Sequence, residues 1–259
     1  EIVYVENGKL QSLKPFPAKK IRPCVFEYIY FSRPDSILNG ECAYEYRKRL
    51  GVELAKESNI DTDVVVPVPD SGNAAAIGYS KHSGINFELG LIRNHYVGRT
   101  FIEPAQKIRG LGVKLKLNAN KSSIKNKKIL LVDDSLVRGT TSYKIVNMLY
   151  DAGAKEVHLR IACPEIKFPD FYGVDMPTKK ELLAANKTVD EICKYINAKS
   201  LKFLSIDGLY KAIGFESRNK IYPQLTDHYF TGEYPVKPID ELGDNKITQL
   251  SLLSSASNN

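Results

Sequence analysis

The 259-residue sequence lacks any apolar run close to the roughly 18 residues that a membrane-spanning helix needs. It also lacks a CxxC pair, since Cys24, Cys42, Cys163 and Cys193 lie far apart. Such spacing carries no zinc signature, and disulfides are not expected in a chain of this size and composition. The first residues contain neither an initiator methionine nor a signal-peptide pattern. These absences predict a fragment or processed chain from a cytoplasmic protein, with reduced thiols and no membrane contact.

Two common nucleotide-binding motifs are also missing, GxxxxGK[ST] of the P-loop and GxGxxG of the dinucleotide fold. The net charge of +7, from 37 basic and 30 acidic residues, nevertheless favours an anionic partner. Nucleic acid, a membrane surface and phosphorylated metabolites would each fit that charge. The surplus lies in residues 93–117 and in scattered lysines, and not in a basic-aromatic stripe. We therefore expect no nucleic-acid partner.

What the sequence does contain is an alternation of apolar, β-branched runs with segments of helical periodicity. This pattern predicts an α/β fold with a mostly parallel sheet flanked by helices. In such sheets ligands bind beyond the carboxyl ends of the strands. The expected strands are 62–69, 85–92, 126–134, 155–164 and a last strand and turn at 201–209, and the expected helices are 41–57, 71–84 and 140–153.

Other segments interrupt this alternation. Residues 93–117 hold six Lys or Arg and one acid, with three glycines and a proline. A long basic loop of this kind is more typical of a functional lid than of a connection that is merely flexible. Two T-x-x-E patterns, Thr178 with Glu181 and Thr188 with Glu191, are typical of capping boxes and are expected to begin short helices. The serine-rich tail beyond about residue 230 is expected to be loosely held.

The stretch ILLVDDSLVRGTTS, residues 129–142, ends an apolar strand with two adjacent acids. A buried strand has no structural use for Asp133 and Asp134 at its tip. Both carry only oxygen acceptors, so they are predicted to accept hydrogen bonds from a vicinal diol or to hold Mg²⁺.

The second half of that stretch is typical of a phosphate site. Gly139-Thr140-Thr141-Ser142 begins a helix, so it offers backbone N–H groups, hydroxyl donors and the positive end of a helix dipole next to Arg138. A simpler interpretation makes Thr140 or Thr141 an N-cap. That interpretation accounts for one hydroxyl, but not for three beside an arginine.

The stretch PVPDSG, residues 67–72, lies at the end of a neighbouring expected strand. Its Asp70, Ser71 and Gly72 could form a second phosphate cradle, although Pro-Asp-Ser-Gly alone is also an ordinary turn. A phosphate cradle beside a diol acceptor indicates a ribose 5-phosphate, and the second cradle would then hold a diphosphate at the other end of the sugar.

These residues resemble the type I phosphoribosyltransferases, and longer matches resemble the glutamine phosphoribosylpyrophosphate amidotransferase family. The resemblance runs in order over roughly residues 20–215. It rests on RPCVFEYIYFSRPDS (22–36), PVPDSG (67–72), NHYVGRTFIEPAQKIR (94–109), LLVDDSLVRGTTS (130–142) and FYGVDMPTKKELLA (171–184).

The resemblance implies a type I phosphoribosyltransferase fold with a long flexible hood loop. Residues 1–22 would be a remnant of, or a linker from, an N-terminal glutaminase domain. Residues 23–230 would be the phosphoribosyltransferase domain, and residues 231–259 a partly disordered C-terminal extension. The implied reaction, the first step of de novo purine biosynthesis, displaces pyrophosphate from C1 of 5-phosphoribosyl 1-diphosphate by ammonia, giving 5-phosphoribosylamine.

The resemblance also implies roles for individual residues. Asp133, Asp134 and Arg99 would be catalytic, and Ser71 would join the two acids in a Mg²⁺ site. The substrate would be bound by Asp70, Ser71, Gly72, Arg93, Tyr96, Ser135, Arg138, Gly139, Thr140, Thr141 and Ser142.

Two departures from the family pattern qualify these expectations. Residue 1 is glutamate, and no cysteine takes the place of the family's glutaminase nucleophile, so this chain is expected to use ammonia and to need a glutaminase domain or subunit for glutamine. Some members carry a four-cysteine iron–sulfur cluster. Here Cys24 stands at one ligand position but Asp170 at another, and residues 215–232 have no cysteine, so no cluster is expected.

Two alternatives stay open at this point. One is a salvage phosphoribosyltransferase that acts on a purine base, which would share only the two strand-end motifs. The other is a non-catalytic regulator of the same fold that binds nucleotide or RNA, although such a regulator would be favoured by loss of Asp133 or Asp134, and both are present. The resemblance further implies feedback inhibition by purine nucleotides and a homo-oligomer.

Overall fold

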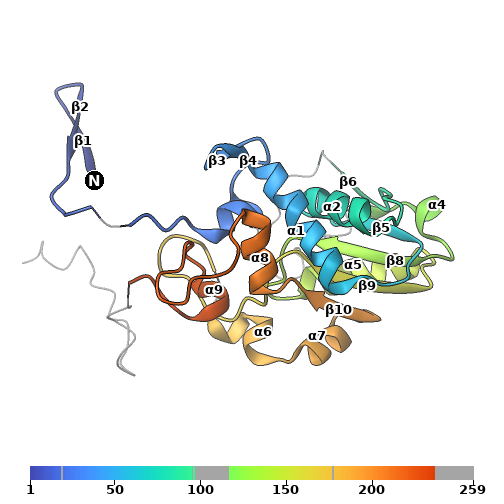
Figure 1. The fold of residues 1–259 in the computed structure, drawn as a ribbon. Helices are drawn as coiled ribbons and strands as arrows, with labels where there is room; N and C mark the ends of the chain where they lie inside the picture. The colour runs from blue at the N-terminus through green and yellow to red at the C-terminus, as the bar shows by residue number, and fades with distance from the viewer. Residues whose placement is uncertain (19, 95, 97–116, 177, 237–259) are drawn as a thin grey trace, which may run out of the picture.

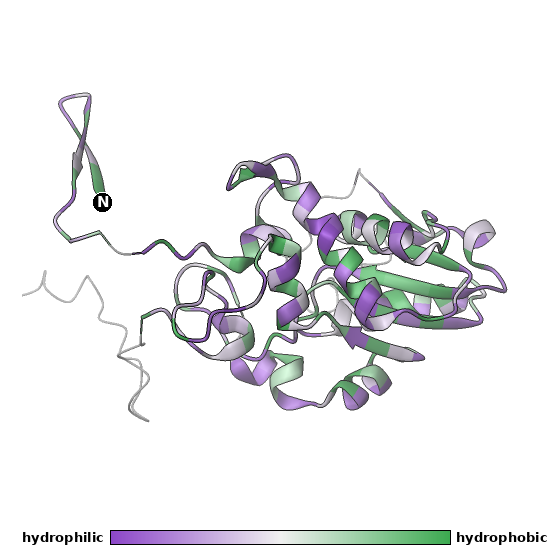
Figure 2. Ribbon diagram, in the orientation of Figure 1, coloured by the Kyte–Doolittle hydropathy of each residue, from purple (hydrophilic) through white to green (hydrophobic). Residues whose placement is uncertain are grey.

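The computed structural model describes residues 1–18, 20–94, 96, 117–176 and 178–236. Its centre is a parallel sheet with the strand order β10-β9-β8-β5 (Figure 1). The strands are β5 (Val64–Pro67), β8 (Lys128–Asp133), β9 (Glu156–Ile161) and β10 (Ser200–Phe203). β5 and β8 are hydrophobic along most of their length (Figure 2), because a parallel strand covered on both faces needs apolar side chains in both directions.

Helices cover both faces of this sheet. α1 (Ala43–Ser58) packs against α2 (Asn73–Ser83), which lies on β5 and β8, and α8 (Ile206–Ile213) packs against α1. α2 leads from β5 towards the sheet edge beyond it, whereas α5 (Thr140–Asp151) leads from β8 to β9 in the opposite direction. Right-handed crossovers therefore place α2 and α5 on opposite faces, and the sequence prediction of a flanked parallel sheet is confirmed.

The expected strand 85–92 is mostly wrong. Only Phe87 pairs with β5, through a single parallel bridge to Val65. The chain then turns, because the Gly90 N–H donates to the Glu88 carbonyl at 2.9 Å. It continues as β6 (Leu91–Arg93), which pairs antiparallel with β7 (Leu117–Ala119). The β6–β7 ribbon joins the two ends of the expected hood loop, of which residues 97–116 lie outside the described part of the chain.

The N-terminal residues form a hairpin of β1 (Ile2–Glu6) and β2 (Lys9–Leu13), in which every residue is exposed. The hairpin stands apart from the sheet and its helices (Figure 1). Before α1 come the π-helix η1 (Glu27–Phe31) and a short ribbon of β3 (Ile37–Leu38) and β4 (Glu41–Cys42). The division of the chain at residues 22 and 230 stays a prediction.

The segments after β7, β9 and α8 contain short helices. They are α4 (Lys121–Ile124), the 3₁₀ helix η3 (Lys179–Glu181), α6 (Leu183–Asn186), α7 (Val189–Tyr195) and α9 (His228–Thr231). The expected last strand is confirmed as β10, but the expected turn after it is the start of α8, where the Ser205 side chain accepts from the Gly208 N–H. Within the described residues no helix is long and apolar enough to span a membrane.

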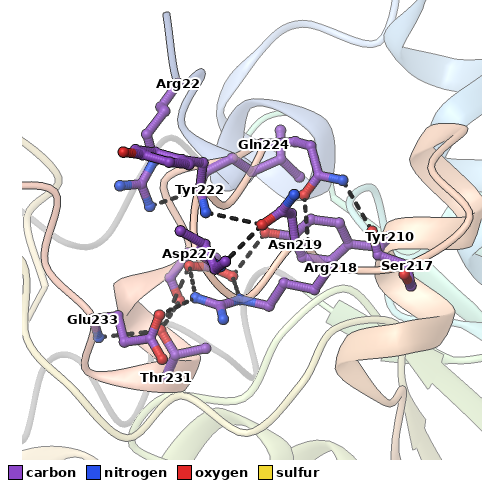
Figure 3. A network of polar contacts seen from close by, with 12 residues as sticks. Arg22, Tyr210, Ser217, Arg218, Asn219, Tyr222, Gln224, Asp227, Thr231 and Glu233 are labelled. Carbon is purple, nitrogen blue, oxygen red and sulfur yellow. Dashed lines mark hydrogen bonds and ion pairs between the residues drawn. The ribbon is translucent and has the colours of Figure 1, made fainter. Parts of the chain in front are cut away.

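A buried polar network fixes the segment that follows α8 (Figure 3). Asp227 is fully buried and accepts hydrogen bonds from the Tyr210 hydroxyl at 2.8 Å and from the Arg218 Nε at 2.6 Å. Arg218 also donates to Glu233 at 2.6 Å, and the Thr231 hydroxyl donates to the Asp227 carbonyl at 3.3 Å. The network ties α9 and Glu233 to α8.

Candidate functional site

The two polar motifs, at the ends of β5 and β8, lie next to each other in the sheet. At this point the connections that leave the two strands run towards opposite edges of the sheet. β5 and β8 are neighbours, and their crossover helices lead away from each other, which is the switch point where ligands bind in open α/β sheets. Asp133 is the last residue of β8 and Ser71 lies in the turn after β5. The Ser71 hydroxyl donates to Asp133 Oδ1 at 3.4 Å, so the expected oxygen donors of the metal site do lie together.

The electrostatics of the acid pair reflect burial and like charge. Burial raises the pKa of both Asp133 and Asp134, and the neighbouring carboxylate raises that of Asp133 further. The Ser135 hydroxyl donates to Asp134, and the Asp134 N–H donates to Asp133 Oδ1 at 2.9 Å. These donors only partly offset the repulsion, so the pair is an arrangement that a cation would stabilise.

A buried arginine beside the pair was not predicted from the sequence. Arg47 is 6% exposed and donates to the carbonyls of Tyr28 and Ser32, at 3.2 and 2.7 Å. Its charge lowers the pKa of Asp134, against the larger effect of burial. The sequence held a signal for it, because Arg47 shares a helical stripe with the buried Ala43, Leu50 and Leu54 of α1, and a charged residue on an apolar stripe needs an internal partner.

The expected phosphate loop leads into α5 through a glycine. Gly139 is the N-cap of α5, with φ of +71°, and among the described residues no side chain caps this helix. The interpretation of Thr140 or Thr141 as a simple N-cap is therefore wrong. Both threonines are exposed, whereas Ser142 is only 7% exposed. The helix thus presents uncapped N–H groups and two hydroxyls at its amino end, as an anion site requires.

Gly139 permits a test of this loop. A Cβ there would lie 2.5 Å from Leu183 Cδ2, whereas at Gly84, which has φ of +76°, it would meet nothing within 4 Å. We expect Gly84→Ala to lose about 1–2 kcal/mol of unfolding free energy from backbone strain alone. Gly139→Ala should lose more in denaturant titrations and should also bind inorganic phosphate more weakly. Equal losses and equal phosphate binding in the two variants would contradict this reading of the loop.

The turn after β5 contains the residues expected at the diphosphate. The peptide bond between Pro69 and Asp70 is cis, and Asp70 forms an ion pair with Arg93 at the end of β6. The Gly72 N–H donates to the Val68 carbonyl at 2.9 Å, so in this conformation it is already paired. A Cβ at Gly72 would lie 2.4 Å from the Val132 carbonyl oxygen, which gives this glycine a packing role between α2 and β8.

The residues expected in the hood are only partly described. Arg93 lies beside Asp70, Tyr96 is fully exposed, and Arg99 lies outside the described residues. The roles assigned to these three residues therefore stay predictions.

The residues considered for an iron–sulfur cluster have other contacts. Cys24 Sγ lies 3.3 Å from the Tyr229 hydroxyl, and burial raises the pKa of Cys24. Asp170 Oδ1 lies 2.8 Å from Nε2 of the buried His228. Across the described ranges no three His, Cys, Asp or Glu side chains are grouped as a metal site. The expectation of no cluster stays a prediction.

A cavity of about 600 Å³ lies elsewhere, between β10 and α7, with Cys193, Ser200 and Phe203 in its lining. It does not include the acid pair or the phosphate loop. The candidate site thus lies at the converging polar groups, apart from this cavity.

No family model matches the chain. It is 57% identical to the amidophosphoribosyltransferase of Rhizobium etli over 247 residues, which is 95% of this chain and 50% of that protein. It is 55% identical to the amidophosphoribosyltransferase of Methanocaldococcus jannaschii over 214 residues, or 83% of this chain and 44% of that protein. The chain thus spans about half the length of these relatives.

A solved structure agrees with these relatives. It is the glutamine phosphoribosylpyrophosphate amidotransferase from B. subtilis complexed with ADP and GMP, with a TM-score of 0.79 and 46% identity over 91% of this chain and 51% of that one. The fold predicted from the sequence, a type I phosphoribosyltransferase sheet flanked by helices, is thereby confirmed. The chain is a homologue of the amidophosphoribosyltransferases and corresponds to their type I phosphoribosyltransferase portion.

Proposed function

We propose that the chain forms 5-phosphoribosylamine and pyrophosphate from 5-phosphoribosyl 1-diphosphate and ammonia, the first step of de novo purine biosynthesis. The observation that carries the proposal is the convergence of the acid pair, the Ser71 hydroxyl and the uncapped end of α5 at one switch point. The 57% identity to a named amidophosphoribosyltransferase supports this reaction over base salvage.

The chain's own residues would bind and orient the sugar. Residues Arg138 to Ser142, at the amino end of α5, would bind the 5-phosphate. Ser135 would contact the substrate next to them, and Asp133 and Asp134 would accept hydrogen bonds from the ribose hydroxyls. Asp70, Ser71 and Gly72 would lie at the diphosphate. Ammonia is already a nucleophile, so no side chain has to remove a proton before it attacks C1.

The residues of the acid pair fit Mg²⁺. Asp133, Asp134 and Ser71 supply carboxylate and hydroxyl oxygens, the ligand type that Mg²⁺ prefers, and the buried like charges favour a cation. When bound, Mg²⁺ would neutralise charge that develops on the departing diphosphate. Exclusion of water from the site would fall to Arg93, Tyr96 and Arg99, because water would otherwise hydrolyse the activated sugar.

Further partners follow from the relatives. ADP and GMP are present in the B. subtilis structure, so we propose that purine nucleotides inhibit this chain by occupying its phosphoribosyl site. The relatives are about twice as long as the matched region, and we propose a glutaminase domain or subunit as the source of ammonia from glutamine. A homo-oligomer and a cytoplasmic location stay predictions.

The proposal is tested by supplying the 259-residue chain with 5-phosphoribosyl 1-diphosphate, Mg²⁺ and ammonium at alkaline pH. We expect pyrophosphate release that depends on ammonium, with phosphoribosylamine as the second product. Using ammonium keeps the result independent of any part of the relatives that lies outside these residues. Turnover with a purine base but not with ammonium would favour the salvage enzyme, and tight binding without turnover would favour the regulator.

A further inference from the structure

The two T-x-x-E patterns of the sequence behave differently in the structure. At Thr188 the capping box closes, since its hydroxyl accepts from the Glu191 N–H and the Glu191 carboxylate accepts from the Thr188 N–H at 2.8 Å. At Thr178 the expected box does not form, and no side chain of the described residues caps η3. Only Oε2 of the Glu181 carboxylate keeps a contact with Thr178. Its Oε1 contacts another segment, so the pattern alone does not account for this glutamate.

Glu181 is directed at the expected phosphate loop. Its Oε1 lies 3.2 Å from Arg138 Nε and 3.1 Å from Arg138 Nη2. The carboxylate therefore holds the Nε edge of the guanidinium. Glu181 does not contact Nη1, which can face another anion. Both side chains are about half exposed, at 56% for Arg138 and 48% for Glu181.

The segment that carries Glu181 is itself fixed to the loop. The Leu183 N–H donates to the Val137 carbonyl at 2.9 Å, directly beside Arg138 in the chain. The Leu183 side chain packs against Gly139 on the other side of Arg138. Glu181 also accepts from the Thr178 hydroxyl at 3.3 Å. The carboxylate is thus held in a defined place relative to the loop.

We propose that Glu181 is a positioning residue that orients Arg138 towards the 5-phosphate of the sugar. This inference rests on the proposed function of residues 138–142 as the phosphate loop. An arginine that is free to rotate would lose side-chain entropy on binding an anion. An arginine already held by its Nε edge would lose less side-chain entropy on binding. In free energy, this difference would exceed the solvent-screened repulsion between the Glu181 carboxylate and the phosphate.

The test is a calorimetric titration of the whole chain with ribose 5-phosphate, which needs no turnover. We expect Glu181→Gln to weaken binding about two- to fivefold, the range for a half-exposed ion pair, and to raise KM for 5-phosphoribosyl 1-diphosphate similarly with kcat nearly unchanged. Glu181→Asp should recover part of the affinity. The matched control is Glu191→Gln, which alters the same T-x-x-E chemistry without touching Arg138 and should bind like the parent.

A double variant separates positioning from a general effect on the fold. In an Arg138→Gln background, Glu181→Gln should have no further effect on ribose 5-phosphate affinity, because the residue through which it acts is gone. Unchanged or tighter binding by Glu181→Gln alone would overturn the inference, as would an equal loss in both backgrounds. A parent chain that does not bind ribose 5-phosphate would instead refute the phosphate loop and the proposed function with it.

Discussion

Replacing Asp134 with asparagine is expected to reduce ammonia-dependent phosphoribosylamine formation at least about 100-fold, the scale seen when one preorganised electrostatic group is removed from an active site. Asp134 is 6% exposed and lies beside Asp133, so its charge acts where water does not screen it. The substitution keeps the shape of the side chain while removing half of the charge that would hold a cation. The measurement is the initial rate at saturating ammonium over a range of Mg²⁺ concentrations.

Stability distinguishes this effect from a failure to fold. Asp134→Asn removes the repulsion between two adjacent carboxylates, so the variant should unfold at a temperature no lower than the parent's. Asp151→Asn, an exposed acid at the other end of α5, serves as the control and should keep the parent's rate. Full turnover by Asp134→Asn, or a loss that a lower melting temperature explains, would count against the proposed role.

Replacing Arg218 with methionine is expected to cost about 3–5 kcal/mol of unfolding free energy, because it leaves a buried charge without its partner. Asp227 is fully buried, and Arg218 supplies it with hydrogen bonds at 2.6 and 3.2 Å. The Tyr210 hydroxyl would remain as a donor, but a neutral hydroxyl cannot balance a carboxylate. Urea titration followed by circular dichroism measures the loss.

An exposed ion pair in the same chain provides the comparison. Arg33 Nη2 and Asp35 Oδ2 are 2.9 Å apart, and the two side chains are 82% and 68% exposed. Arg33→Met should change the unfolding free energy far less than Arg218→Met does, because solvent screens this pair. Similar losses from the two arginine substitutions would show that burial of Asp227 does not control the stability of this segment.

The parts of the fold that were predictable are those with a strong local signal. The run Ile129 to Val132 and the periodicity of residues 140–153 placed β8 and α5 within a few residues. The prediction of a strand over 85–92 failed because the apolar residues of this segment pack in a turn. The segment forms one bridge to β5, and the chain then bends at Gly90. Whether an apolar segment forms a full strand or a single long-range bridge is not visible in the periodicity of its residues.

The sequence allowed most residues of the candidate site to be predicted, but not the contacts that hold them in place. Asp133 and Ser71 could be assigned to one site because both follow parallel strands. Glu181 could not, because the T-x-x-E pattern has an adequate local explanation and the contact to Arg138 crosses from one segment to another. Arg47 was missed for a similar reason, since its acceptors lie in η1 and at Ser32 directly after it, and not in its own helix.

The pairing of β5 with β8 has a consequence for how the chain acquires its site during folding. Val64 pairs with Ile129, and the whole expected hood segment lies between them in the sequence. Parallel pairing of such distant residues is slow, because the long loop between them must close before any contact forms. Until it forms, Ser71 and the two acids belong to separate parts of the chain. The site therefore comes into being together with the middle of the sheet, and a partly folded chain would hold the acids without their hydroxyl partner.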